Sequence, residues 1–482
     1  MHFPSFIGPS NVAQSPIADA ERTVNYYVER TALPGEKNTA NLYPTPGVTT
    51  VATSTRSPGR GSFEAAGRAF AVIGAQFTEI TEPMSLVEWG TVAVNDNPVT
   101  MSYNGSSYDG GGGDELFITS GENGYIFNLA ANTLTLVRTG NTTMGAMIDG
   151  FFLALDVTNS ALYLSEFRDG TTWDPTQFQQ RNAAGDPWVA LIVNYHDIWL
   201  VGEKTSDIWY NAGLSPFPLL PRPGGTVPYG TRAPWSVEVA GDAVHWLAQS
   251  QNGAGYVVRI SGYTPQIIST PALQVALESY TDTADAVGDT FEMLGHTFYF
   301  LSFPTAHATW LFDLQSGVWT ELGTWVSEDN RYDAWRPIYH VFAYGRHLML
   351  DRESGAIYEL SGTSGLDAEA RPLRRLRRAP ALFTEHRRMF VSRFELMLES
   401  GLGAVSGQGS DPQVMLRISR DGGKTFGNER SRSAGALGKY SYRTFWTKCG
   451  SGRDLVFETT MSDPIPYRLI DAYLTPKRST EA

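Results

Sequence analysis

The residues with the clearest capacity for chemistry are arginines that gather in one short segment. Between residues 371 and 393 the chain has eight arginines and one acid, Glu385; the segment therefore carries +7, and because the whole chain carries −13, the rest sums to −20. Guanidinium groups recognise carboxylates and phosphates. The segment is either a solvated linker or a contact with an acidic neighbouring subunit, a partner protein or DNA phosphates. The candidate interface or DNA-contact residues are Arg371, Arg374, Arg375, Arg377, Arg378, Arg387, Arg388 and Arg393.

A second motif follows the Asp-box pattern, Ser-x-Asp-x-Gly-x-Thr-aromatic, and predicts a hairpin turn rather than a catalytic group. In such a turn the aspartate accepts backbone N–H bonds, the glycine takes a positive φ and the aromatic ring packs beneath. The embedded Gly-Lys-Thr is not a phosphate loop, because Ile418 stands where such a loop needs a glycine. The structural turn residues are Ser419, Asp421, Gly423, Thr425 and Phe426.

Other chemistry-bearing residues form no recognisable motif. The eight histidines are dispersed without a metal-binding spacing. No catalytic residue, metal site or cofactor is therefore predicted. Carboxylates are abundant, so the fold alone can assemble a glycosidase pair that leaves no trace in the sequence. A sialidase- or glycosidase-like enzyme, with arginines and carboxylates clustered at its centre, stays open as an alternative.

Composition indicates a globular, strand-rich protein. The chain has 482 residues with 48 glycines, 27 prolines and 12% aromatic residues, which suits many short strands joined by turns. It has no run of about 18 apolar residues and no basic flank before an apolar core at its start, so neither a membrane span nor a secretory signal is expected. The single cysteine, Cys449, is expected to be a buried thiol. The net charge of −13 argues against a generic nucleic-acid binder.

A recurring turn carries the fold prediction. A turn, often glycine with a polar residue, precedes a short apolar strand seven times, at steps of roughly 35 to 54 residues. Such repeats are typical of a β-propeller, because one small sheet cannot bury both faces alone and stacking sheets in a ring does so. We therefore expect an all-β protein with a β-propeller of six or seven blades; an irregular β-sandwich is the alternative. The strands begin at Phe70, Leu116, Phe151, Ile198, Val244, Phe298 and Leu348.

The repeats divide the chain into three parts. Residues 1–55 are expected to form an N-terminal arm with a strand that closes the ring, and residues 56–364 the propeller. Residues 365–482 are expected to form the arginine-rich linker and an additional C-terminal antiparallel β region, either a small domain or a further blade. A short helix at 271–280 is expected between blades.

The N-terminal run is specific enough to suggest a family. Residues 18–29 read Ala-Asp-Ala-Glu-Arg-Thr-Val-Asn-Tyr-Tyr-Val-Glu, and Tyr43 to Gly47 read Tyr-Pro-Thr-Pro-Gly. This pattern resembles the opening of the packaged-DNA stabilization proteins, the tail accessory or tail nozzle proteins of short-tailed bacteriophages. Tyr26 replaces the leucine usual in that family.

The resemblance implies a structural role without catalysis. It implies a homohexamer below the portal-bound adaptor protein, assembled in the host cytoplasm and located in the virion tail. Such a tube closes the channel after packaging, retains the genome and conducts viral double-stranded DNA through its lumen during ejection. A tail needle or plug and a tailspike or fibre are the further partners implied. A monomeric propeller that binds other proteins is the second alternative.

Overall fold

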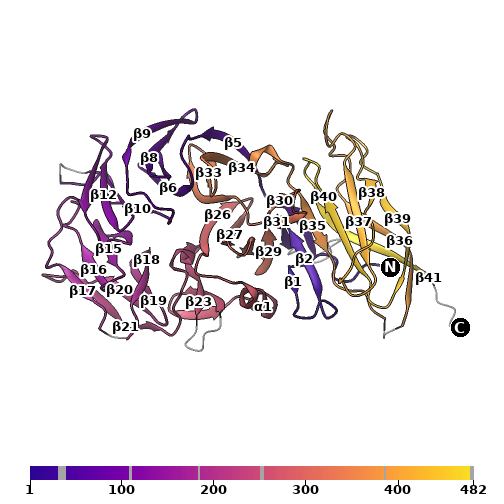
Figure 1. Ribbon diagram of the computed structural model, residues 1–482, viewed down its shortest axis with the longest axis horizontal. Coiled ribbons are helices and arrows are strands. Elements are labelled where there is room, and N and C mark those ends of the chain that lie inside the picture. The colour runs from indigo at the N-terminus through magenta and orange to yellow at the C-terminus, as the bar shows by residue number, and fades with distance from the viewer. Residues whose placement is uncertain (31–38, 108–110, 183–184, 250–254, 385–386, 478–482) are drawn as a thin grey trace.

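The computed structural model describes residues 1–30, 39–107, 111–182, 185–249, 255–384 and 387–477. The molecule is elongated, with a ring of small sheets toward one end and a compact pair of sheets at the other (Figure 1). Among the described residues, the only α-helix is α1 (Pro271–Ser279), which lies between blades as predicted. No helix in this described part is long and apolar enough to cross a membrane.

The ring is a β-propeller, as predicted, and the described residues give it seven four-stranded blades. The first four blades each contain four strands that follow one another in sequence. Blade one is β6 (Gly59–Ala65), β7 (Arg68–Ile73), β8 (Gln76–Thr81) and β9 (Ser85–Thr91); blade two is β10 (Thr100–Tyr103), β11 (Glu115–Ser120), β12 (Asn123–Asn128) and β13 (Thr133–Arg138). Blade three is β14 (Met144–Ile148), β15 (Phe151–Asp156), β16 (Ala161–Leu164) and β17 (Phe178–Gln180); blade four is β18 (Trp188–Asn194), β19 (Asp197–Gly202), β20 (Ser206–Asn211) and β21 (Leu219–Val227).

The last three blades complete the ring. Blade five is β22 (Glu238–Ala240), β23 (Ala243–Gln249), β24 (Gly255–Ser261) and β25 (Thr264–Ile267); blade six is β26 (Val287–Met293), β27 (His296–Phe303), β28 (Ala308–Asp313) and β29 (Val318–Leu322). Blade seven is β32 (Pro337–Ala343), β33 (Arg346–Asp351), β34 (Ala356–Ser361) and, from the start of the chain, β5 (Gly47–Thr53). Strand β5 pairs antiparallel with β34, so an N-terminal strand occupies the outer edge of the last blade.

Each of the seven turns found in the sequence connects the first and second strands of a blade. Several contain a residue in the left-handed region, such as Gly67 with φ 79° and Gly345 with φ 73°. Glycine adopts this conformation without a Cβ clash, which is why the repeat shows in the sequence. Large aromatic side chains fill the space between neighbouring blades: Trp199 of blade four and Trp246 of blade five meet edge to face with centroids 6.2 Å apart.

The second lobe is a β-sandwich. One sheet has the order β3-β4-β41-β36-β39, and the other contains β2, β35, β40, β37 and β38. Their shared core includes Phe3, Phe394, Trp446 and Phe457, and the predicted buried thiol of Cys449 lies in it with 2% exposure. The strands are β2 (Ala20–Val24), β3 (Tyr26–Arg30), β4 (Ala40–Pro44), β35 (Arg375–Arg378), β36 (Met389–Leu398), β37 (Gln413–Ser419), β38 (Arg430–Ser433), β39 (Thr444–Gly452), β40 (Val456–Met461) and β41 (Leu469–Lys477).

Smaller elements complete the chain. The short strand β1 (Asn11–Val12) pairs with β2, and β30 (Thr324–Val326) pairs with β31 (Arg331–Asp333). Single 3₁₀ turns lie at η1 (Pro234–Ser236) and η2 (Ala368–Ala370).

Two details differ from the sequence-based expectations. Strands β2, β3 and β4 belong to the sandwich, so of residues 1–55 only β5 joins the propeller. The segment expected to be an arginine-rich linker instead contains β35, which is hydrogen-bonded on both sides within a sheet. Strand β2 pairs with β35 more than 350 residues away, and β35 pairs with β40 about 80 residues further on, so local sequence gives no sign of these partners.

Candidate functional site

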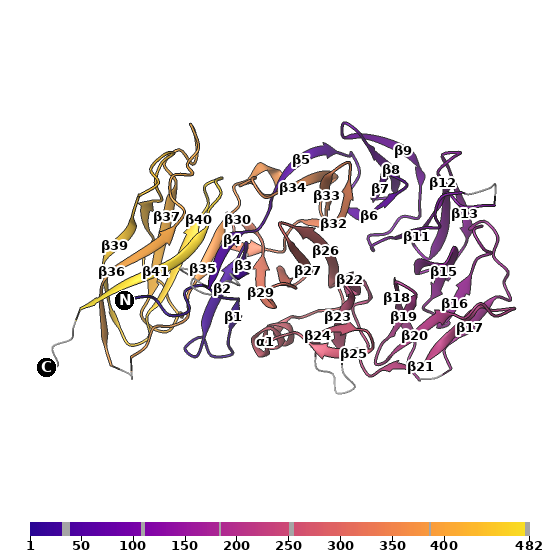
Figure 2. The ribbon, with the colours of Figure 1, turned by 180° about the vertical axis from the view of Figure 1, so that it is seen from behind.

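The place where propeller and sandwich meet is a continuous sheet, which we call the joint. Strand β29, the outer strand of blade six, lies parallel to β2, and β2 pairs antiparallel with β35. Strand β35 then pairs with β40 in the sandwich. Figure 2 shows β2 and β35 between the two lobes. Because backbone hydrogen bonds run across both boundaries, the lobes are fixed to each other rather than tethered.

Arg377 lies at the centre of the joint with its side chain fully buried. It donates to the carbonyl oxygens of Phe6 at 2.6 Å and Pro9 at 3.1 Å, to Thr23 Oγ1 at 2.7 Å, and to the carboxylate of Glu21. Burial raises the pKa of Glu21 even with Arg377 beside it. The guanidinium therefore ties the N-terminal segment to the sandwich from inside the protein.

A second ion pair joins β2 to the propeller. Arg22 Nη2 lies 2.6 Å from Glu321 Oε2, and Arg22 Nε donates to the same oxygen at 2.9 Å. Burial opposes the charge of Arg22, but Glu321 raises its pKa above the usual value, so the pair is ionised. Ser10 Oγ also donates to Glu321 Oε1 at 2.9 Å. Glu321 thus binds two points of the N-terminal segment to blade six.

Asn25 makes the turn between β2 and β3. Its φ is 60°, a left-handed value that asparagine adopts more readily than most residues. Its Nδ2 donates to the carbonyl oxygens of Gly323 at 2.9 Å and Arg374 at 2.7 Å, and its Oδ1 accepts from Gly323 N at 3.0 Å. One side chain therefore connects blade six, the N-terminal segment and the residue that precedes β35.

The other arginines of the β35 segment also face the interior. Burial lowers the pKa of Arg375, which lies close to Tyr26 and Tyr467. Arg374 stacks over the ring of Trp325 at 3.9 Å, and Arg378 Nη2 lies 2.7 Å from Glu458 Oε2. These contacts are internal to the chain, so half of the predicted interface cluster stabilises the joint.

Four of the eight candidate arginines lie outside the joint. Arg371, Arg387 and Arg388 are exposed, and Arg393 is half-buried. Arg371 forms an ion pair with Glu369 at 2.5 Å, Arg393 lies 2.9 Å from Glu395, and Arg388 Nε donates to Ser451 Oγ at 3.0 Å. The prediction of a surface contact is therefore wrong for Arg375 and Arg377, which are buried. Arg387 and Arg388, which are exposed, are the best remaining candidates for such a contact.

The Asp-box residues form a turn between β37 and β38. Asp421 accepts hydrogen bonds from Ser419 Oγ at 2.6 Å, Thr425 N at 2.9 Å and Thr425 Oγ1 at 2.6 Å. Hydrogen bonds from Ser419 and Thr425 lower the pKa of Asp421 far below its usual value. Gly423 has φ 92°, and the guanidinium carbon of Arg378 lies 4.7 Å from the centre of the Phe426 ring. The motif anchors a loop against the joint.

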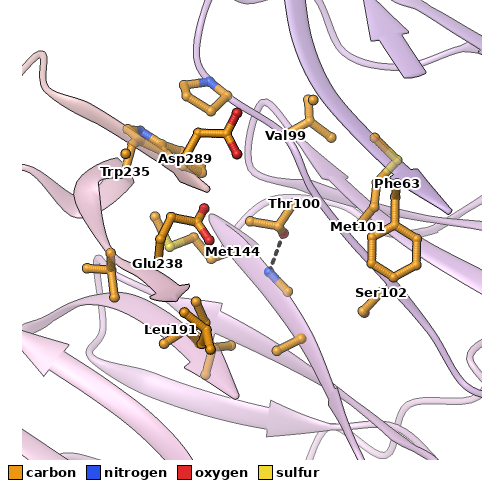
Figure 3. A pocket seen from close by; sticks show the side chains of 18 of the residues that line it. Phe63, Val99, Thr100, Met101, Ser102, Met144, Leu191, Trp235, Glu238 and Asp289 are labelled. Carbon is orange, nitrogen blue, oxygen red and sulfur yellow. Dashed lines mark hydrogen bonds between the residues drawn. The ribbon is translucent and has the colours of Figure 1, made fainter. Parts of the chain in front are cut away.

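A cavity of about 600 Å³ lies on the propeller axis, lined by the first strands of all seven blades. Two carboxyl groups, Glu238 of β22 and Asp289 of β26, face it (Figure 3). Burial raises the pKa of Glu238 to about 8, with a further contribution from Asp289, and burial raises the pKa of Asp289 to about 7. No group of three or more His, Cys, Asp or Glu side chains suited to a metal ion occurs in the described part of the chain.

The sequence marks some of these residues but does not show their roles. Glu21, Arg22 and Asn25 belong to the N-terminal pattern, whose purpose the sequence does not reveal. No local motif marks Glu238 and Asp289, which are 51 residues apart in the sequence. Their positions on the first strands of adjacent blades are the only available signal.

The fold and the joint define a class of protein: a seven-bladed propeller locked to a β-sandwich through its N-terminal strands. Two family models match this division. The model for the bacteriophage P22 Gp10 β-propeller matches residues 23–365, and the model for the bacteriophage P22 Gp10 β-sandwich matches residues 374–475. The chain belongs to the bacteriophage P22 Gp10 family, which confirms the resemblance drawn from the N-terminal pattern and makes it a structural component of a phage tail.

Other comparisons are more distant. No curated protein matches the chain. Among solved structures, the N-terminal domain of Nup159 is similar with 9% identity and TM-score 0.40, covering 70% of this chain and 98% of that one. BamB from Moraxella catarrhalis has 10% identity and TM-score 0.39, covering 70% and 96%. YCF48 from Cyanidioschyzon merolae has 9% identity and TM-score 0.39, covering 65% and 98%. Likeness at this level says nothing about function.

Proposed function

We propose that this protein is a non-enzymatic wall segment of a homohexameric tail nozzle. In this role the ring attaches to the portal-bound adaptor, closes the channel after packaging, retains the genome and forms the conduit for double-stranded DNA during ejection. A needle or plug closes the tube, and spikes or fibres attach around it. Assembly takes place in the host cytoplasm, before the tail is complete.

The observation that carries this proposal is the separation of charge between the two lobes. The propeller segment, residues 47–364, contains 14 Lys and Arg against 33 Asp and Glu, a net charge of −19. The remaining residues, 1–46 and 365–482, which include the sandwich strands, contain 23 against 17, a net charge of +6. An acidic propeller repels DNA phosphates, so DNA slides past it without binding. Since exposed charges act over about 8 Å at physiological salt, the repulsion requires propeller acids at the channel wall.

The basic sandwich supplies the contact between copies. Phe383, Arg387, Arg388 and Phe390 form what we call the attachment face; the two rings are 73% and 42% exposed and the two arginines are exposed. Exposed aromatic and arginine side chains together are typical of protein interfaces. In a ring of identical copies, this face of one copy meets the acidic propeller of the next, where the charges are complementary.

The joint has the rigid connection between lobes that the proposed role requires. A tube that holds packaged DNA under pressure has to transmit force between its attachment point and its wall. The continuous sheet and the half-buried Arg22–Glu321 pair connect the two lobes, and the buried Arg377–Glu21 pair fixes β2 to β35 on the sandwich side of the joint. A flexible linker at this point would let the lobes separate.

The attachment face is tested by charge reversal. Arg387→Glu combined with Arg388→Glu is expected to prevent the chain from assembling on purified portal–adaptor complexes, measured by co-sedimentation at physiological salt. Lys204→Glu combined with Arg232→Glu changes the charge equally at exposed propeller positions and is the matched control. Assembly of both variants at the wild-type level would contradict the proposed face.

The enzyme alternative is less well supported. Sialidase- or glycosidase-like chemistry at the axis requires arginines beside the carboxyls, and none of the described residues lining the cavity is an arginine.

A further inference from the structure

We propose that the axial cavity of the propeller binds a small organic cation, a primary alkylammonium whose charged end lies between Glu238 and Asp289. This inference is independent of the nozzle role, since it concerns the interior of one propeller. It rests on the shape of the cavity, the position of the two carboxyls and the absence of lysine and arginine from the described residues that line it.

The cavity has the size and lining of a ligand site. About 600 Å³ falls within the range of roughly 300–1,000 Å³ typical of small-molecule pockets. Met101, Met144 and Leu191 give it apolar walls, and Trp235 adds an aromatic surface near the carboxyls (Figure 3). An alkyl chain fits such walls, and an aromatic face also favours a neighbouring cation.

Both carboxyl-bearing residues line the cavity from adjacent blades. Glu238 and Asp289 come from the first strands of adjacent blades, β22 and β26. Asp289 is fixed by its own neighbours: Oδ2 accepts from His340 N at 2.7 Å and Oδ1 from Thr290 N at 2.7 Å. The carboxylate of Asp289 is therefore held in place by backbone N–H groups, and Glu238 lies on the first strand of the adjacent blade.

No positive charge of the described chain compensates the pair inside the cavity. Its described lining includes no lysine or arginine, and the remaining titratable side chains there are Tyr103, Tyr195, Tyr339 and His340. Burial, with His347 nearby, lowers the pKa of His340 to about 4, so it is neutral near pH 7, and burial raises the pKa of Tyr339. Behind Glu238, burial also raises the pKa of Tyr299, whose hydroxyl donates to Ser236 O at 2.8 Å.

An ammonium group can supply a positive charge and hydrogen-bond donors to the two carboxyls. It brings one positive charge and three N–H donors to two carboxyls whose described cavity lining holds no lysine or arginine. Because the carboxyls hold protons near neutral pH, binding releases protons, and affinity rises as the pH rises through about 7 to 8. An alkylammonium stays charged over this range, as a lysine side chain does with its pKa of about 10.4.

The test is isothermal titration of the full chain with n-butylammonium chloride at pH 6 and pH 9, with n-butanol and sodium chloride as controls. We expect saturable binding of butylammonium whose affinity increases on the order of tenfold or more between the two pH values, corresponding to one or more carboxyl pKa units. Butanol and sodium chloride should give no saturable heat. Absence of saturable butylammonium binding at pH 9, or equal binding of butanol, would overturn the proposal.

Variants locate the binding within the cavity. Glu238→Gln and Asp289→Asn each keep the shape and an acceptor oxygen, and each should weaken binding at pH 9 by on the order of tenfold or more. Glu328→Gln, an exposed glutamate, is the matched control and should bind as the wild type does. Wild-type affinity in both cavity variants would also overturn the proposal. The wild-type pH series decides the question without relying on how any variant folds.

Discussion

Arg377 and Glu21, 356 residues apart in sequence, form a buried ion pair at the point where the propeller meets the sandwich. Both side chains are almost completely removed from water, so each depends on the other for its charge. The pair lies in a sheet that runs from blade six into the sandwich. The pair holds β2 against β35, and β2 is the sandwich strand that contacts β29 of blade six.

Removal of the Arg377 guanidinium should be strongly destabilising. Arg377→Met leaves Glu21 buried without its partner, and we expect the free energy of unfolding to fall by about 3–5 kcal/mol. Urea denaturation followed by tryptophan fluorescence measures this. Arg388→Met, at an exposed position, should change it by less than about 0.5 kcal/mol.

A double variant separates the ion pair from general packing. Arg377→Met combined with Glu21→Gln removes both charges, and it should recover a large part of the loss, since no unpaired buried charge remains. If Arg377→Met is no more damaging than Arg388→Met, the joint does not depend on this pair.

Gly47 should be intolerant of even a methyl group. It ends the Tyr-Pro-Thr-Pro-Gly pattern and begins β5, where an added Cβ would lie 2.4 Å from Ser364 O and 2.6 Å from Leu366 O. Gly47→Ala should lower stability by about 1–3 kcal/mol in thermal unfolding, because backbone atoms have to move. Gly255→Ala, where a Cβ meets open space, is the control. If Gly47→Ala and Gly255→Ala had equal melting temperatures, the backbone around β5 would have room for the added methyl group.

The axial carboxyls should make the propeller less stable at alkaline pH. The folded-state pKa values of Glu238 and Asp289, about 8 and about 7, lie above those of the unfolded chain, so the folded state binds more protons. The contribution of these two groups to the free energy of unfolding is therefore greatest at low pH. It is lost as the pH rises from about 4 through 8.

Comparison with Glu238→Gln isolates this effect from other titrating groups. Relative to the wild type, this variant should gain on the order of 2 kcal/mol of stability between pH 5 and pH 9, measured by urea denaturation across the range. A difference between the two proteins that does not change with pH would mean that Glu238 titrates normally.

Loss of the Asp421 carboxylate should loosen one turn and nothing more. Asp421→Ala removes the acceptor for Thr425 N and Thr425 Oγ1, so amide hydrogen exchange between Ser419 and Phe426 should become faster. Assembly on portal–adaptor complexes should stay at the wild-type level. Loss of assembly would assign this turn a contact role that its geometry does not indicate.

The propeller was visible in the sequence because its repeat is local. Each blade requires a turn before its second strand, and turns with residues such as Gly67 leave a recognisable mark. The arginine run was harder to interpret, since eight arginines beside one acid look like a solvated surface. Their partners, among them Glu21, Glu458 and Trp325, lie far away in sequence, and only the folded chain brings them together. The axial pair of Glu238 and Asp289 was invisible for the same reason.

Electron microscopy of the full chain mixed with portal–adaptor complexes tests the central claim most directly. The account predicts a closed ring of six copies that extends the portal channel, with the acidic propellers at its wall and the basic sandwiches in contact between neighbours. Portal–adaptor complexes without added density, or single attached copies that close no ring, would contradict it.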